Sequence, residues 1–179
     1  MQQCGVGLVP ITRDGQGRLA FAAPPLLRSG PLDSATLAQA LTALGISADA
    51  IVDASWIDNG PGWLGILVAS AEEVLAIRPA NTPLKIGVIG PHPAGSASAY
   101  EVRGFFPDGS VTFEDPVTGS LNASAAQWLV GSGRFTPPYI ATQGAALGRA
   151  GQVFISSDTT GQIWVGGDAV ECVSGFVEL

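Results

Sequence analysis

The feature that most constrains the fold is a series of short apolar segments that are separated by glycine- or proline-containing turns. The clearest segments are residues 50–56, 64–70, 84–90, 99–106 and 151–157. Short apolar runs bounded in this way are typical of buried strands. With 24 glycines among its 179 residues, the chain has enough turn-forming positions to connect many such strands. We therefore expect a core built mainly from β-sheet.

Further strands are predicted near both ends of the chain. The segments "GVGLVPI" and "RLAFAA" flank "TRDGQG", in which Asp-Gly suits the tight turn of a β-hairpin. Residues 151–157 and 161–167 flank "DTTG" in the same way, and residues 169–179 are expected to form one more strand.

Three segments carry helical signals instead. In residues 33–45, three leucines recur at helical spacing between a polar capping residue and a glycine. Residues 70–78 open with a capping box, Ser70 with Glu73, and stop before Pro79. Residues 120–130 place apolar side chains on one stripe among several small residues. The pattern predicts a strand-rich α+β domain with three helices, one of them embedded between strands.

Composition and charge exclude several classes of function. The net charge is −7 and the eight basic residues are scattered, so nucleic acid is not an expected partner. No apolar run approaches the roughly 20 residues that span a bilayer, and the N-terminus does not resemble a signal peptide. Cys4 and Cys172 lie far apart without a CxxC spacing, so we expect no metal site and interpret both as reduced, buried strand thiols of a cytoplasmic protein.

The segment "FEDPVTGSLNASAAQWLVG" places acids and a Thr-Gly-Ser turn directly before the third predicted helix. The backbone N–H groups at Thr118, Gly119 and Ser120 lie where a helix starts, so they are unpaired within it and form an anion site. Asp115 can project a carboxyl group into the same space. The alternative is that Asp115 or Thr118 merely caps the helix, and local pattern alone favours that alternative.

Longer motifs around this segment resemble a known family. "RGFFPDGSVTFEDPVTGSLNASAAQWL" is similar to the C-terminal signature of the phenazine-biosynthesis (PhzF-type) isomerases. "QGAALGRAGQVFI", "IWVGGDAVECVSGFVEL" and "DNGPGWLGILVASAEEVLAIRP" resemble other family segments in the same order. The resemblance implies a diaminopimelate-epimerase-like fold, in which each of two lobes is a curled, barrel-like, mostly antiparallel sheet around a central helix. It also implies a substrate held between the lobes, at the N-termini of both central helices.

The resemblance further implies proton transfer between carbon atoms of a small carboxylate, without cofactor or metal. Asp115 matches the acid of the C-terminal lobe and Ser120 the hydroxyl at the helix start. Thr118, Gly119 and the N–H group of Ser120 would bind the substrate. Asn59 and Gly60 belong to a turn that would border the cleft, and a purely turn-forming role is at least as well supported for both.

The sequence departs from the family pattern in its N-terminal part. The family's other lobe supplies a glutamate and a Gly-His-Pro histidine, and neither is found here. We expect residues 1–30 to be a remnant hairpin of that lobe, 31–170 the C-terminal lobe and 171–179 a returning strand. His92, the only histidine, is interpreted as a surface turn residue. Glu114 should point away from Asp115 in an extended segment, and the cysteines do not fall on the positions of the catalytic pair in diaminopimelate epimerases.

Three functions remain open at this stage. The first is an isomerase or epimerase lobe that acts once a separate N-terminal lobe or a second copy completes it. The second is a non-catalytic carboxylate-binding module or degenerate remnant. The third, a purely structural interaction protein, does not explain "EDPVTGS". Since a small incomplete sheet leaves open edges, we also expect a homodimer.

Overall fold

The computed structural model describes residues 1–5, 7–176 and 178, with the backbone only for Cys4. Three α-helices lie in this part of the chain: α1 (Ser34–Leu44), α2 (Ala71–Ala76) and α3 (Gly119–Gly131). The strands are β1 (Gln2–Cys4), β2 (Gly7–Val9), β3 (Ile11–Arg13), β4 (Leu19–Ala22), β5 (Arg28–Gly30), β6 (Ile51–Asp58), β7 (Trp63–Val68), β8 (Lys85–Pro91), β9 (Tyr100–Asp108), β10 (Val111–Asp115), β11 (Tyr139–Gln143), β12 (Gly151–Ser157) and β13 (Ile163–Gly167). Two short 3₁₀ turns, Ala48–Ala50 and Ala145–Leu147, connect them.

Eleven of these strands form one sheet in the order β3-β4-β13-β12-β11-β9-β8-β7-β6-β5, with β10 paired to β9. Neighbours are antiparallel except β7 with β8 and β9 with β11, which are parallel. The α+β class expected from the sequence is confirmed. The sheet is not closed into a barrel, because β3 and β5 lie at its two ends and do not pair with each other.

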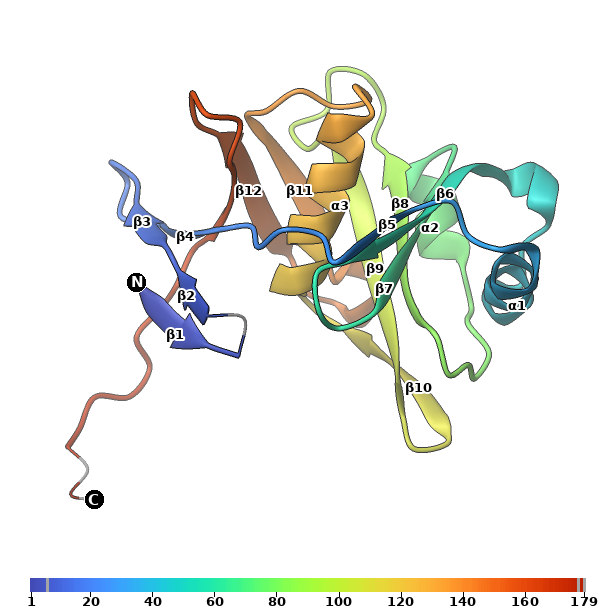
Figure 1. The fold of residues 1–179 in the computed structure, drawn as a ribbon, viewed down its shortest axis with the longest axis horizontal. Coiled ribbons are helices and arrows are strands. Elements are labelled where there is room, and N and C mark those ends of the chain that lie inside the picture. Colours follow the sequence, from blue (N-terminus) through green and yellow to red (C-terminus); the bar gives the residue numbers. More distant parts are fainter. Residues whose placement is uncertain (6, 177, 179) are drawn as a thin grey trace.

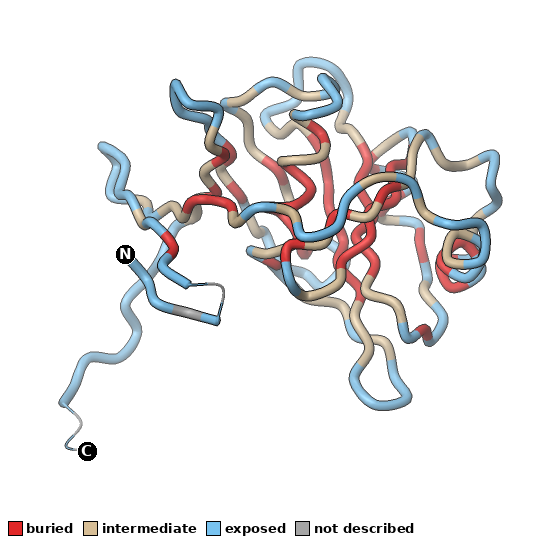
Figure 2. The backbone as a smooth tube through the Cα atoms, in the orientation of Figure 1, coloured by how far each residue is buried: buried red, intermediate tan, exposed pale blue. Residues whose placement is uncertain are grey.

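The helices cover opposite faces of this sheet. Helix α3 contacts β13 near one end of the sheet and β6 and β7 near the other, so the sheet curves around it (Figure 1). Helices α1 and α2 share a second apolar core with the other face of β7 and β8. Side chains of β7 alternate between the two cores, with Trp63 and Leu67 toward α3 and Leu64 and Ile66 toward α1 and α2. All residues of β7 are buried (Figure 2), which explains why this strand is a continuous apolar run.

A row of glycines lets α3 lie close to the sheet. Gly65, Gly87 and Gly104 are directly opposite one another on β7, β8 and β9. A Cβ atom at Gly65 would lie 2.8 Å from the Trp128 ring, and one at Gly104 would lie 2.9 Å from Leu121. A Cβ atom at Gly87 would also collide with Leu121. Glycine inside a strand commonly marks such a close approach of another element.

The three predicted helices are confirmed, together with the caps of the first two. Asp33 accepts a hydrogen bond from the Thr36 N–H group at 2.9 Å at the start of α1. Ser70 Oγ accepts from the Glu73 N–H group at 3.2 Å, and the Glu73 carboxylate reaches back to the N–H group of Ala69 at 3.0 Å. None of the helices in the described part of the chain is long and apolar enough to cross a membrane.

The N-terminal segment differs from the sequence-based prediction. The single strand expected at residues 5–11 is divided, because β2 pairs with β1 whereas β3 forms the predicted hairpin with β4. This hairpin is not an orphan, since β4 also pairs with β13 of the main sheet. The division of the chain into a remnant and a lobe stays a prediction.

The prediction of a strand after β13 is wrong for residues 169–176, which form no strand. β3 of the N-terminal hairpin lies at the end of the sheet, so an open edge is present, but residues 169–176 do not pair with it. Val170, Val173 and Phe176 are 83%, 90% and 105% exposed. Cys172 is also exposed rather than buried, while the side chain of Cys4 and residues 177 and 179 lie outside the described residues.

Candidate functional site

Helix α3 begins with unpaired backbone donors. Thr118 occupies the N-cap position, but its side chain makes no capping hydrogen bond. Within the described chain, the N–H groups of Gly119, Ser120 and Leu121 have no acceptor. These groups carry the positive end of the helix dipole, so an anion is the natural partner. The side-chain cap that local pattern favoured is therefore not what the structure contains.

The Asp115 carboxylate is held beside this helix start. Thr118 Oγ1 donates to Asp115 Oδ2 at 2.8 Å. Asp115 Oδ1 accepts no hydrogen bond from the described residues, and the residue is half-buried at the end of β10, opposite Gly104. The hydroxyl of Thr118 thus orients the acid instead of capping the helix, and one carboxylate oxygen stays available.

A buried amide network fixes the backbone between Asp115 and α3. Gln143, 1% exposed on β11, accepts hydrogen bonds through Oε1 from the Thr118 N–H group at 3.0 Å and from Asn122 Nδ2 at 2.7 Å. Its Nε2 donates to the Asp115 carbonyl oxygen at 2.9 Å and to Thr118 Oγ1 at 3.0 Å. All four polar positions of this side chain are therefore used to hold one turn of backbone.

The turn at residues 58–62 reaches the same helix from β6 and β7. Asn59, 5% exposed, donates through Nδ2 to the Ser120 carbonyl oxygen at 2.9 Å. Trp63 Nε1 donates to Ser120 Oγ at 3.0 Å, which leaves the hydroxyl hydrogen of Ser120 free for a ligand. Gly60 has a φ of 132°, which a residue with a side chain rarely adopts. The structure thus brings Asn59 and Gly60 to the start of α3.

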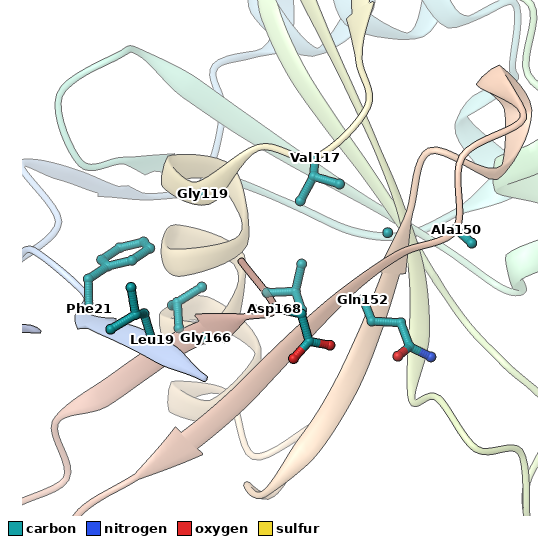
Figure 3. Close-up of a pocket in the computed structure, with 12 residues that line it drawn as sticks. Leu19, Phe21, Val117, Gly119, Ala150, Gln152, Gly166 and Asp168 are labelled. Atoms are coloured by element: carbon teal, nitrogen blue, oxygen red, sulfur yellow. The ribbon is translucent and has the colours of Figure 1, made fainter. Parts of the chain in front are cut away.

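Two cavities lie beside this helix start. One, of about 460 Å³, is lined by Leu19, Phe21, Val117, Gly119, Gln152 and Asp168 together with neighbouring backbone (Figure 3). The other, of about 540 Å³, is lined by Asn59, Gly60, Ser120 and residues of the N-terminal segment. Phe21 lines both. The expected binding residues therefore line one or the other of these cavities, Gly119 the first and Asn59, Gly60 and Ser120 the second, while their roles in binding stay predictions.

Glu114, Glu101 and His92 each have a side-chain partner away from the start of α3. Glu114 forms a bidentate ion pair with buried Arg103, at 2.9 and 2.6 Å, and so faces away from the site as expected. His92 is not a free surface residue, because its Nε2 lies 2.9 Å from Thr142 Oγ1 and 3.7 Å from the buried Glu101 carboxylate. Among the described residues no three His, Cys, Asp or Glu side chains lie close enough to share a metal ion.

Four residues at the site had no role predicted from the sequence: Gln143, Asn122, Phe21 and Asp168. Gln143 and Asn122 are amides far apart in sequence, and no local pattern signals that they meet. Phe21 was assigned to a hairpin strand without a role. Asp168 follows β13 and is the one acidic residue among those lining the cavity at Gly119.

Fold and site together define an α+β lobe whose sheet curves around a central helix, with an acid and unpaired N–H groups at the start of that helix. The family model of phenazine biosynthesis-like proteins (PhzC-PhzF) matches residues 1–175. A Schizosaccharomyces pombe protein named antisense-enhancing sequence 1 is 32% identical over 98% of this chain and 65% of its own length. The chain belongs to the phenazine biosynthesis-like (PhzC-PhzF) family.

Several solved structures share the fold, and two of those described next are named as PhzF or PhzC/PhzF proteins. A PhzF-family protein of Bacillus anthracis superposes with a TM-score of 0.66 at 17% identity, over 91% of this chain and 62% of its own. A Clostridium difficile PhzC/PhzF protein superposes with a TM-score of 0.65 at 21% identity, over 97% of this chain and 62% of its own. A "predicted epimerase" of Pseudomonas aeruginosa superposes with a TM-score of 0.64 at 20% identity, over 93% of this chain and 63% of its own. The chain thus spans less than two thirds of the length of each of these proteins.

Proposed function

We propose that the chain supplies one side of an isomerase or epimerase active site, which moves a proton on a small carboxylate substrate. The observation that carries this proposal is the position of the Asp115 carboxylate, held by Thr118 beside three unpaired N–H groups at the start of α3. An acid next to an anion site can transfer a proton to or from the carbon that bears the bound carboxylate. Family membership and the similar fold of the P. aeruginosa "predicted epimerase" support the same reaction class.

In this proposal the substrate carboxylate binds at the N-terminus of α3. The N–H groups of Gly119 and Ser120 donate to it, and the free hydroxyl hydrogen of Ser120 adds a third donor. Asn59 and Gly60 line the same cavity as Ser120. Such backbone donors are fixed before the ligand arrives, so binding requires little reorganisation.

Asp115 is the proton-transferring group. Because Thr118 donates to Oδ2, the second oxygen is the one that is free to take up or release a proton. A racemising or isomerising site needs a second acid or base on the opposite face of the substrate. We propose that this group comes from a complementing lobe or from a second copy of the chain, which would also cover the exposed apolar residues Leu8, Val173 and Phe176.

Deuterium incorporation into small carboxylates tests the catalytic part of the proposal. In deuterated buffer, with and without an added N-terminal lobe, we expect exchange at the carbon next to the carboxylate wherever the second side of the site is present, and we expect Asp115→Asn to lower its rate by at least about a hundredfold. Asp49→Asn, which makes the same change at an exposed acid beside β6, should leave the rate unchanged. Equal exchange rates for the Asp115 variant and the wild-type protein would remove Asp115 from the mechanism.

A second candidate function is carboxylate binding without turnover, and it is favoured because no second acid facing Asp115 is identified among the described residues. Amide NMR with acetate or malonate separates the two. Saturable shifts at Gly119 and Ser120 without any deuterium exchange would indicate a binding module. If neither shifts nor exchange occur, both functions are wrong.

Assembly is tested separately. We propose a homodimer, since the exposed apolar residues of the N-terminal segment and of residues 169–176 are typical of surfaces that a partner covers. Size-exclusion chromatography with light scattering at micromolar concentration should give twice the mass of the chain. A clean monomer would contradict the dimer. A complementing lobe would then be the remaining source of the second acid or base.

A further inference from the structure

The cavity beside Ser120 differs from the one at Gly119 in the charge of its walls. None of the described residues that line it is charged. Its apolar side chains come from Val9, Phe21, Pro24 and Pro61. By contrast, Asp168 lies in the wall of the cavity at Gly119. With a volume of about 540 Å³ and mostly apolar walls, the cavity beside Ser120 has the properties of a small-molecule site.

Phe21 connects this cavity with the start of α3. A Cβ atom placed on Gly119 would lie 3.5 Å from two carbon atoms of the Phe21 ring, so the ring lies against the first turn of the helix (Figure 3). The hydroxyl of Ser120 lines the same cavity, and its hydrogen is free because Trp63 donates to its oxygen. One small molecule can therefore place a carboxylate at the helix start and an apolar group against Phe21.

The walls of the cavity are fixed by hydrogen bonds within the chain. On one side, the Pro24 carbonyl oxygen accepts a hydrogen bond from Gln127 Nε2 of α3 at 3.0 Å. On the other side, Asp58 Oδ1 accepts from the N–H groups of Gly60 and Gly62 at 2.7 and 2.6 Å and so closes the turn between β6 and β7. Because the pocket is formed in advance, little conformational freedom is lost when a ligand enters it.

We propose that the substrate carries an uncharged, apolar group, which binds in this cavity while the substrate carboxylate binds at the start of α3. This inference rests on the proposed function and adds a class of substrate to it. Moving apolar surface from water to such walls is favourable, and each buried CH₂ group strengthens binding roughly fourfold. A charged group in the same place loses its water without a partner, since no described lining residue carries the opposite charge.

Three ligands with equal numbers of carbon atoms test the proposal. Hexanoate ends in a methyl group, adipate in a second carboxylate and 6-aminohexanoate in an ammonium group. Each is titrated into the full chain at constant ionic strength and followed by amide NMR, with acetate as the reference for the carboxylate site alone. We expect hexanoate to shift Val9 and Phe21 as well as Gly119 and Ser120, and to bind at least about tenfold more tightly than acetate. Adipate and 6-aminohexanoate should bind at least about tenfold more weakly than hexanoate.

The outcomes separate this inference from the proposed function. Acetate shifts at Gly119 and Ser120, with hexanoate binding no more tightly than acetate, would overturn the apolar subsite and leave the carboxylate site standing. Adipate or 6-aminohexanoate binding as tightly as hexanoate would do the same. If none of the ligands shifts Gly119 and Ser120, the proposed function fails and the inference fails with it.

A substitution at Phe21 tests which residue selects the apolar group. Phe21→Ala should weaken hexanoate binding by about fivefold or more and leave acetate binding unchanged, whereas Phe21→Leu should keep most of the hexanoate affinity. Phe113→Ala, at an exposed aromatic residue of β10 that does not line the cavity, should change neither. An equal loss for both ligands would show that Phe21 only supports the fold. The comparison of ligands needs no variant, so it decides the proposal even where Phe21→Ala impairs folding.

Discussion

Replacing Gln143 with leucine tests whether the buried amide network holds the start of α3. Leucine is of similar size, so Gln143→Leu removes four hydrogen bonds while creating little empty space. The change leaves the Thr118 N–H group without a partner. It also leaves one amide hydrogen of Asn122 unpaired, since the remaining bond of Asn122 goes to the Thr118 carbonyl oxygen at 2.9 Å.

The expected loss follows from these two orphaned donors. Thr118 is 8% and Asn122 0% exposed, so neither group gains water in exchange. A buried polar group left unsatisfied costs about 1–3 kcal/mol, and two of them give about 2–6 kcal/mol. Because a domain of this kind is stable by only about 5–15 kcal/mol, the effect is large enough to measure.

Urea denaturation followed by tryptophan fluorescence gives the free energy of unfolding directly. Gln39→Leu on the exposed face of α1 is the matched control and should stay within about 0.5 kcal/mol of the wild-type value. Adding Asn122→Leu to Gln143→Leu removes both members of one hydrogen bond, so the double variant should lose less stability than the sum of the single variants. A Gln143→Leu protein as stable as the Gln39→Leu control would refute the network's role.

Three further predictions concern other parts of the fold. Gly90→Ala should lower the melting temperature, because the new Cβ would collide with the backbone carbonyl that starts α2; Gly131→Ala, on an α3 residue with open space around it, should raise it. The pKa of Asp158 is lowered to about 2, mainly by a hydrogen bond from the Thr160 hydroxyl. The ionised Asp158 carboxylate therefore stabilises the fold at pH values above the pKa that this residue has in the unfolded chain. This stabilisation should be lost as the pH falls from about 4 toward 2, and Asp158→Asn should flatten that part of a stability-against-pH curve. Burial raises the pKa of Tyr139 to about 12 and that of Tyr100 well above 10.0, so the folded protein should show no tyrosinate absorbance near pH 10, whereas a rise at that pH would contradict the burial of both rings.

Much of the fold could be predicted because the signals are local. The capping box at Ser70 and Glu73 and the Asp-Gly turn before β4 each depend on residues within one turn of chain. The strand predicted after β13 is absent from residues 169–176, and no local pattern in this apolar segment distinguishes a paired strand from an unpaired one. β11 was missed because the segment before Gln143 is short and follows two prolines, so its apolar run is weak.

The candidate site also has a part that local sequence predicts and a part that depends on tertiary contacts. "EDPVTGS" determined by itself that an acid lies three residues before the Thr118 N-cap, and the family resemblance gave Asp115 its expected role. Only the tertiary structure decided that Thr118 orients Asp115 instead of capping α3. That outcome depends on Gln143, 25 residues further along the chain, which takes the Thr118 N–H group. Asn59 reaches Ser120 across 61 residues. Such contacts follow from strand register and from the close approach of α3 to glycines in the sheet, and neither is encoded in neighbouring residues.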